Sequence, residues 1–130
     1  MLDSTLPPGL RRVLVVDDDR DTGQSIAMML RARGHVSVYV DEPVKALAAA
    51  KAMRAQIAFI DLWMPVVDGY MLARILRGAP ELKNLFLVAL AGLGRPEDPA
   101  RSREAGFDLH VNKPLDVPAL DSILAQFDRR

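Results

Sequence analysis

A short apolar run that ends in a carboxylate constrains the fold of this chain more than any other feature. Residues 57–60 read Ile-Ala-Phe-Ile, and Asp61 follows them directly. The run is too short for a helix and lacks polar alternation, so it predicts a strand buried on both faces. Open α/β sheets bind ligands at the carboxyl ends of their strands, which is where Asp61 is expected. An aspartate can also simply begin the next turn, so Asp61 alone does not define a site.

A second apolar run near the start of the chain also ends in acid. Residues 13–16 read Val-Leu-Val-Val, and Asp17, Asp18 and Asp19 follow. Two buried strands that deliver carboxylates to the same edge of a sheet indicate a site rather than two unrelated turns.

Such runs alternate with amphipathic segments along the whole chain. The expected strands are 12–16, 36–40, 57–61, 85–90 and 107–111. The expected helices are 24–33, 43–53, 69–77, 96–105 and one that begins after Asp116, and residues 91–94 are expected to form a flexible turn. Five strand–helix units with short connections predict parallel strands, right-handed crossovers and helices on both faces of the sheet. The expected fold is therefore an α/β, doubly wound five-stranded parallel sheet of the flavodoxin-like order 2-1-3-4-5.

Helix ends and buried faces also follow from local patterns. Asp41 is expected to cap the second helix, with Pro43 just inside its start, and Asp116 to cap the last helix. The residues expected to face the core are Ile26, Met29 and Leu30 in the first helix, Val44, Leu47 and Ala48 in the second, Leu72, Ile75 and Leu76 in the third, and Val117, Leu120, Ile123, Leu124 and Phe127 in the last.

Composition excludes several classes of function. The 130 residues include no cysteine, which excludes thiol catalysis and cysteine-type zinc sites. They carry 17 basic and 17 acidic side chains, and this balance disfavours direct contact with nucleic acid. No apolar stretch is long enough to span a membrane, and the first residues lack the features of a signal peptide. We expect a cytoplasmic protein without membrane contact, with residues 1–10 as a leader or linker and residues 11–130 as one domain.

The polar residues that stand out all follow expected strands. They are Asp17 and Asp18 after the first strand, Asp61 after the third, and Lys113 after the fifth. Carboxylates that converge repel one another, and a cation relieves the repulsion. Oxygen ligands suit Mg²⁺, which commonly binds one or two carboxylates together with a phosphate oxygen. Lys113 would add a fixed positive charge for a second phosphate oxygen.

Three segments together resemble the receiver domain of two-component response regulators, the CheY-like domains. They are Val-Val-Asp-Asp-Asp at 15–19, Asp-Leu-Trp-Met-Pro-Val-Val-Asp-Gly at 61–69 and Asn-Lys-Pro at 112–114. The resemblance covers residues 11–127. It implies either a stand-alone receiver or one cut from a longer chain, such as a hybrid sensor histidine kinase, that signals by protein contact.

The resemblance implies a role for each matching residue. Asp61 would be the phosphoacceptor, and Lys113 would contact the phosphoryl group. The ligands of Mg²⁺ would be Asp18, Asp61 and the backbone carbonyl of Trp63, with Asp17 acting through water. The phosphoryl donor would be a sensor histidine kinase or a phosphotransfer protein, and an unidentified downstream protein would bind the face made by the fourth helix, fifth strand and last helix, with Arg101 and His110 on it. No separate substrate turnover is expected, so the protein would not be an enzyme in that sense.

Two positions depart from the family pattern. Ala91 stands where the family has threonine or serine, and His110 stands where it usually has tyrosine or phenylalanine, so both switch positions are altered. These departures leave open a degenerate receiver that acts as a protein-binding module, with weak or absent switching. An aspartyl-phosphate phosphatase is disfavoured, because Trp63 stands where its second acid would be, and a nucleotide-binding domain lacks its Gly-rich loop.

Overall fold

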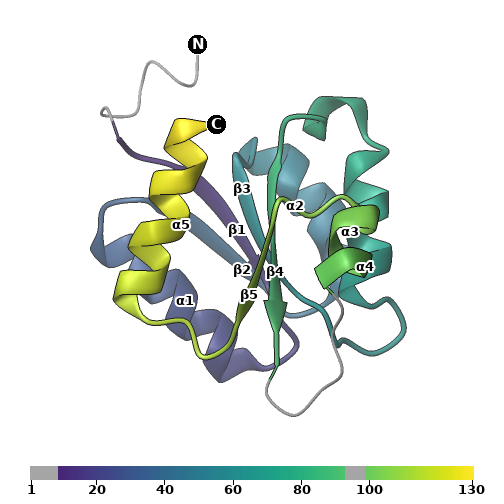
Figure 1. The fold of residues 1–130 in the computed structure, drawn as a ribbon, viewed down its shortest axis with the longest axis horizontal. Coiled ribbons are helices and arrows are strands. Elements are labelled where there is room, and N and C mark those ends of the chain that lie inside the picture. Colours follow the sequence, from purple (N-terminus) through teal and green to yellow (C-terminus); the bar gives the residue numbers. More distant parts are fainter. Residues whose placement is uncertain (1–8, 93–98) are drawn as a thin grey trace.

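A computed structural model describes residues 9–92 and 99–130 of the chain. Five parallel strands form one sheet in the order β2-β1-β3-β4-β5, with helices on both faces (Figure 1). The strands are β1 (Arg12–Val16), β2 (Val36–Val40), β3 (Ile57–Asp61), β4 (Phe86–Ala91) and β5 (Leu109–Asn112). The helices are α1 (Arg20–Ala32), α2 (Ala46–Met53), α3 (Gly69–Arg77), α4 (Pro99–Ala105) and α5 (Val117–Arg129), with short 3₁₀ turns η2 (Pro43–Lys45) and η3 (Pro80–Leu82). The doubly wound sheet predicted from the sequence is confirmed.

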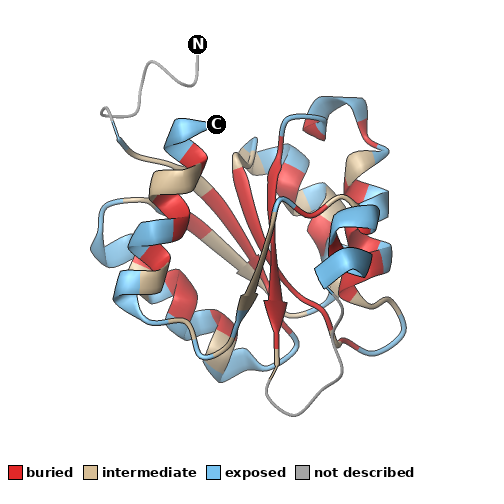
Figure 2. Cartoon of the chain, viewed as in Figure 1, coloured by how far each residue is buried: buried red, intermediate tan, exposed pale blue. Residues whose placement is uncertain are grey.

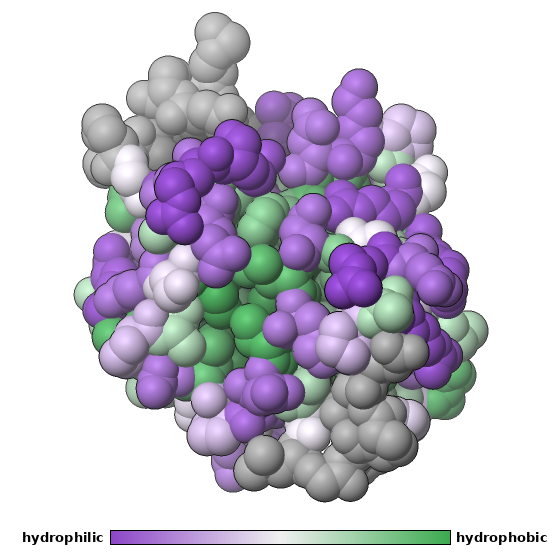
Figure 3. All heavy atoms as spheres, viewed as in Figure 1, coloured by the Kyte–Doolittle hydropathy of each residue, from purple (hydrophilic) through white to green (hydrophobic). Residues whose placement is uncertain are grey.

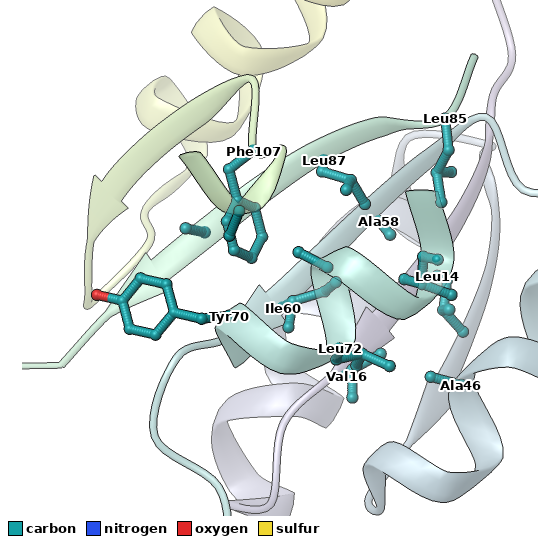
Figure 4. Packing of buried hydrophobic residues seen from close by; sticks show 14 of the residues in the cluster. Leu14, Val16, Ala46, Ala58, Ile60, Tyr70, Leu72, Leu85, Leu87 and Phe107 are labelled. Carbon is teal, nitrogen blue, oxygen red and sulfur yellow. The ribbon is translucent and has the colours of Figure 1, made fainter. Parts of the chain in front are cut away.

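The sheet separates two apolar layers. Alternate residues of the central strands face α2, α3 and α4, and the residues between them face α1 and α5. The first layer includes Leu14, Ile60, Leu72 and Phe107, shown in Figure 4. Because β3 and β4 have helices on both faces, every one of their residues is buried, whereas the edge strand β5 is half-buried (Figure 2). Continuous apolar runs are the sequence signature of such two-sided burial.

The predicted second helix was partly wrong. Asp41 is not its N-cap, because a 3₁₀ turn at Pro43–Lys45 comes first and the α-helix begins only at Ala46. A 3₁₀ turn has about three residues per turn rather than 3.6, so it changes which residues face the core. Val44 is therefore 72% exposed and Ala48 is exposed, while Ala46 and Ala50 are buried.

Smaller differences affect other elements. Helix α1 begins at Arg20 rather than Gln24, and the fifth strand runs over Leu109–Asn112 rather than residues 107–111. Ile75 is 46% exposed because the buried stripe of α3 lies on Leu72, Leu76 and their neighbours. The predicted leader falls almost wholly in residues 1–8. The second half of the predicted turn at 91–94 and the start of the predicted fourth helix fall in residues 93–98. Both segments lie outside the described part of the chain.

The predicted cap at Asp116 is confirmed, and Asp68 caps α3 in the same way. The carboxylates of Asp68 and Asp116 accept hydrogen bonds from the N–H groups of Met71 and Ala119, which caps α3 and α5 as an N-terminal aspartate does. Among the described residues, no helix combines the length and the apolar character needed to span a membrane.

Candidate functional site

Three carboxylates converge at the carboxyl edge of the sheet. Strands β1 and β3 are adjacent and parallel, so Asp17, which follows β1, lies beside Asp61, the last residue of β3. The carboxylate oxygens of Asp17, Asp18 and Asp61 lie within 4.8 Å of one another. Asp17 is 0% exposed and Asp61 4% exposed, whereas Asp18 is open to solvent. The structure therefore brings the predicted acids together, with two of them buried.

Lys113 lies between the two buried acids. Its Nζ is 2.8 Å from Oδ2 of Asp17 and 3.3 Å from Oδ1 of Asp61. Burial works to lower the pKa of Lys113, but its contacts with Asp17 and Asp61 outweigh burial and raise that pKa above the ordinary value. The lysine is therefore held as a cation. One positive charge faces two buried carboxylates, so the site is left with an excess of negative charge.

Burial and this excess charge both act on the pKa of Asp61. Burial raises the pKa of this carboxyl to about 7, and the nearby charge of Asp17 acts in the same direction. Lys113 and the backbone N–H of Trp63, which lies 3.3 Å from Asp61 Oδ1, oppose the rise but do not cancel it. Near neutral pH the Asp61 carboxyl is thus poised between its two protonation states, and a divalent cation would favour the ionised one.

The residues present fit a hard cation. Oδ2 of Asp17 is buried and makes no well-aligned hydrogen bond, and its contact with Lys113 is an ion pair at 2.8 Å. Two further carboxylates supply oxygen atoms beside it, and oxygen ligands of this kind are those that Mg²⁺ prefers. Asp17, Asp18 and Asp61 would hold the ion, together with the backbone carbonyl of Trp63, whose residue is half-buried next to Asp61.

The loop that follows β3 folds back tightly over the strand end. The N–H of Gly69 donates a 3.0 Å hydrogen bond to the carbonyl of Leu62. A Cβ atom at Gly69 would lie 2.5 Å from the carbonyl oxygen of Asp61, so no larger residue fits without moving the strand end. Val66, at the tip of the loop, is 94% exposed and has a φ of 72°, which is uncommon for a β-branched residue.

The two altered switch positions lie on β4 and β5, the two strands that follow β3 in the sheet. Ala91 is the last residue of β4 and is buried. Its side chain is a methyl group, which cannot donate a hydrogen bond to a phosphoryl oxygen. His110 is half-buried, and its Nδ1 lies 2.7 Å from Oγ of the buried Ser102 of α4. The guanidinium of Arg101 lies 4.0 Å from the centre of the Tyr70 ring of α3. Helix α4 is thus joined to β5 and to α3 by side chains.

Sequence reasoning missed one group beside the acids. The hydroxyl of Tyr39, at the end of β2, donates a 2.7 Å hydrogen bond to the carbonyl oxygen of Asp17. The expected strand order places β2 beside β1, which was one signal for Tyr39. The second signal, Gly23 inside α1, became visible only in the structure, because the predicted helix began at Gln24; an internal glycine commonly has a packing reason.

Comparison with known proteins identifies the family. A family model for the response regulator receiver domain matches residues 13–125. The chain belongs to the response regulator receiver domain family. Phosphorylation and Mg²⁺ binding are typical of that family.

Relatives of the receiver domain agree with this assignment. The present chain is 30% identical over 115 residues to an uncharacterized 14.6 kDa protein of Leptolyngbya boryana, with 88% of each chain covered. It is 26% identical over 106 residues to the DNA-binding dual master transcriptional regulator RpaA of Synechocystis, covering 82% of this chain but only 44% of RpaA. The receiver domain of the sensor histidine kinase PA1611 of Pseudomonas aeruginosa, solved with a magnesium ion coordinated in its active-site cleft, is 25% identical with a TM-score of 0.82, covering 93% of this chain and 99% of that one.

Proposed function

We propose that this receiver domain takes a phosphoryl group onto Asp61 from a phosphohistidine of a sensor histidine kinase or a phosphotransfer protein. One observation carries the proposal: the Lys113 ammonium lies within 3.3 Å of the Asp61 carboxylate, which stands beside two further acids. In the transfer, the bond between phosphorus and the histidine nitrogen breaks, and a bond between phosphorus and an Asp61 oxygen forms. Such transfer depends on positioning and charge neutralisation more than on covalent chemistry by the protein.

The charges at the site have separate tasks in this proposal. Lys113, held cationic by the two buried acids, would neutralise one phosphoryl oxygen and orient it. Mg²⁺, held by Asp17, Asp18, Asp61 and the Trp63 carbonyl, would supply the remaining positive charge. The N–H of Trp63 donates a 3.3 Å hydrogen bond to Asp61 Oδ1, which helps to hold this carboxylate in place.

A hollow beside the site supports docking of the phosphoryl donor. It has a volume of about 520 Å³ and lies between α1 and the segment after β5, lined by residues that include Ile26, Met29, Lys113 and Leu115. An apolar surface next to the lysine would let a partner helix bring its phosphohistidine to Asp61. A larger hollow of about 630 Å³, among Arg12, Lys51 and Arg54, lies at the opposite edge of the sheet, away from the acids.

The downstream partner would bind the face made by α4, β5 and α5. Figure 3 shows apolar side chains gathered between α5 and α4 on this face, flanked by polar residues. Leu109 and Val111 of β5 are half-buried on the side of the sheet that faces α5, while His110 between them contacts Ser102 of α4, next to Arg101. We expect the signal to leave through protein contact at this surface, with no turnover of a separate substrate.

Incorporation of phosphate from acetyl phosphate in the presence of Mg²⁺ tests the main proposal. Intact-mass spectrometry is expected to show one phosphoryl group on the wild type and none on Asp61→Asn. Asp68→Asn is the matched control, because asparagine keeps the cap of α3 and the site is untouched. Equal incorporation by wild type and Asp61→Asn would refute the assignment.

A degenerate receiver that only binds proteins is the second candidate. The alanine at position 91, in place of a hydroxyl residue, favours it. A wild type that binds its partner but takes up no phosphate from acetyl phosphate would support this second function instead.

A further inference from the structure

Tyr39 and Gly23 form a fitted pair next to the acidic turn. The Tyr39 ring, on β2, lies directly over Gly23 of α1, and a Cβ atom at position 23 would be 2.1 Å from Cε1 of the ring. Glycine inside a helix costs roughly 0.5–1 kcal/mol relative to alanine. Any side chain at position 23 would clash with the Tyr39 ring in its present place, so the close contact requires glycine there despite this cost.

The hydroxyl of Tyr39 is directed at one backbone atom of the site. It donates a 2.7 Å hydrogen bond to the carbonyl oxygen of Asp17, while the N–H of Asp17 donates a 3.3 Å bond to the carbonyl of Val40. The pairing of β1 with β2 ends at Val16 and Val40, so the Tyr39 hydroxyl adds one bond beyond the last paired residues.

The carbonyl held by Tyr39 belongs to the peptide unit that joins Asp17 to Asp18. A peptide unit is planar, so fixing its oxygen also sets the direction in which the next residue leaves. Asp17 is held at its side chain as well, because its Oδ1 accepts a 2.9 Å hydrogen bond from the N–H of Asp19. Asp18 is exposed, and its carboxyl shares a side-chain hydrogen bond with Asp61, so its position relative to Asp61 depends on the direction of this peptide.

We infer that Tyr39 is a positioning residue for the cation site: its hydroxyl orients the Asp17–Asp18 peptide so that the Asp18 carboxylate faces Asp61. Gly23 provides the space that the ring needs to reach this carbonyl. The inference rests on the proposed binding of Mg²⁺ by the three acids. It differs from a packing role, in which the ring would only fill space between β2 and α1.

Tyr39→Phe separates these roles, because it keeps the ring over Gly23 and removes the hydroxyl. We expect the dissociation constant for Mg²⁺, measured by calorimetry, to rise about threefold to tenfold, the effect of losing one hydrogen bond. In the metal-free variant, the NMR shift of the Asp18 amide is expected to change, since that N–H belongs to the released peptide.

Ser37→Ala is the matched control. The buried Ser37 hydroxyl also joins β2 to α1, by a 3.0 Å hydrogen bond to the carbonyl of Ala27, but it lies at a distance from the acids along the strand. We expect Ser37→Ala to lower the unfolding temperature while leaving Mg²⁺ affinity within twofold of the wild type.

Gly23→Ala tests the pair from the other side. The added methyl displaces the ring, so Mg²⁺ affinity is expected to fall although the hydroxyl is still present. Combined with Tyr39→Phe it should weaken binding little further, because both changes break the same contact.

Two outcomes would overturn the inference, and they are distinguishable. If the wild type binds Mg²⁺ and Tyr39→Phe binds it equally well, Tyr39 does not position the site, while the proposed function stands. If calorimetry shows that the wild type itself binds no Mg²⁺, the proposed function fails and the inference fails with it.

Discussion

The backbone N–H of Lys113 donates a 2.8 Å hydrogen bond to the carbonyl oxygen of Ala91. The residue that lacks the usual hydroxyl thus still anchors the lysine through its backbone. Changing the side chain at position 91 leaves this bond in place. Charge neutralisation by Lys113 and the grip of a hydroxyl on a phosphoryl oxygen are therefore separable in this protein.

Ala91→Thr is expected to strengthen the conformational response to phosphorylation. A hydrogen bond to a charged group contributes about 1.5–3 kcal/mol, and a ligand shifts a two-state equilibrium only by its differential affinity. The threonine hydroxyl would therefore raise the coupling roughly tenfold to a hundredfold. The conformational response is measured by backbone NMR with and without beryllofluoride, as chemical-shift changes in the residues around position 91 and in β5.

Ala91→Val is the control for this comparison, because valine matches the shape of threonine and lacks its hydroxyl. Position 91 is buried, so both variants add similar bulk, and an effect of volume would appear in both. Shifts in the wild type as large as those in the threonine variant would show that the alanine does not weaken the switch.

Asp61→Asn is expected to change how stability depends on pH. The pKa of Asp61 is raised by burial from 3.8 to about 7, so the folded state binds more protons than the unfolded state between these values. Protonation of Asp61 therefore stabilises the folded, metal-free wild type. This stabilisation is fully present below about pH 4 and is lost as pH rises through about 7. In Asp61→Asn that fall should be absent, and at pH 8 the free energy of unfolding of the variant should exceed that of the wild type by on the order of 4 kcal/mol.

Urea unfolding at a series of pH values measures this difference. Asp68→Asn serves again as the control, since its carboxylate caps a helix outside the acidic cluster. Parallel stability curves for wild type and Asp61→Asn from pH 4 to pH 8 would contradict the raised pKa. Saturating Mg²⁺ should reduce the gap between the two proteins, because the ion offsets the repulsion that the mutation removes.

Trp63 is expected to report Mg²⁺ binding. It is the only tryptophan in the chain, it is half-buried, and its N–H contacts the Asp61 carboxylate. A saturable change in its fluorescence is expected on titration with Mg²⁺, and Asp18→Asn should weaken it strongly by removing one ligand. A flat fluorescence titration, with binding established by calorimetry, would show that the indole does not sense the ion.

Much of the fold followed from local pattern. Fully buried strands need continuous apolar runs, and the runs at 13–16 and 57–60 were recognisable for that reason. The second helix was misassigned because Pro43 is compatible with both a 3₁₀ turn and an α-helix. The exposure of Val44 depends on which of the two forms.

The sequence by itself determined the order of the elements and the identity of the residues at each strand end, since hydrophobic period and turn residues are local properties. Strand order then brought Asp17 and Asp61 together, because parallel neighbours end at the same edge. Only the tertiary structure decided that Asp17 is buried while Asp18 faces solvent, that Lys113 reaches both buried acids, and that Tyr39 bonds to Asp17. These contacts join segments far apart in the chain, and their distances depend on sheet register and helix packing, which no local pattern contains.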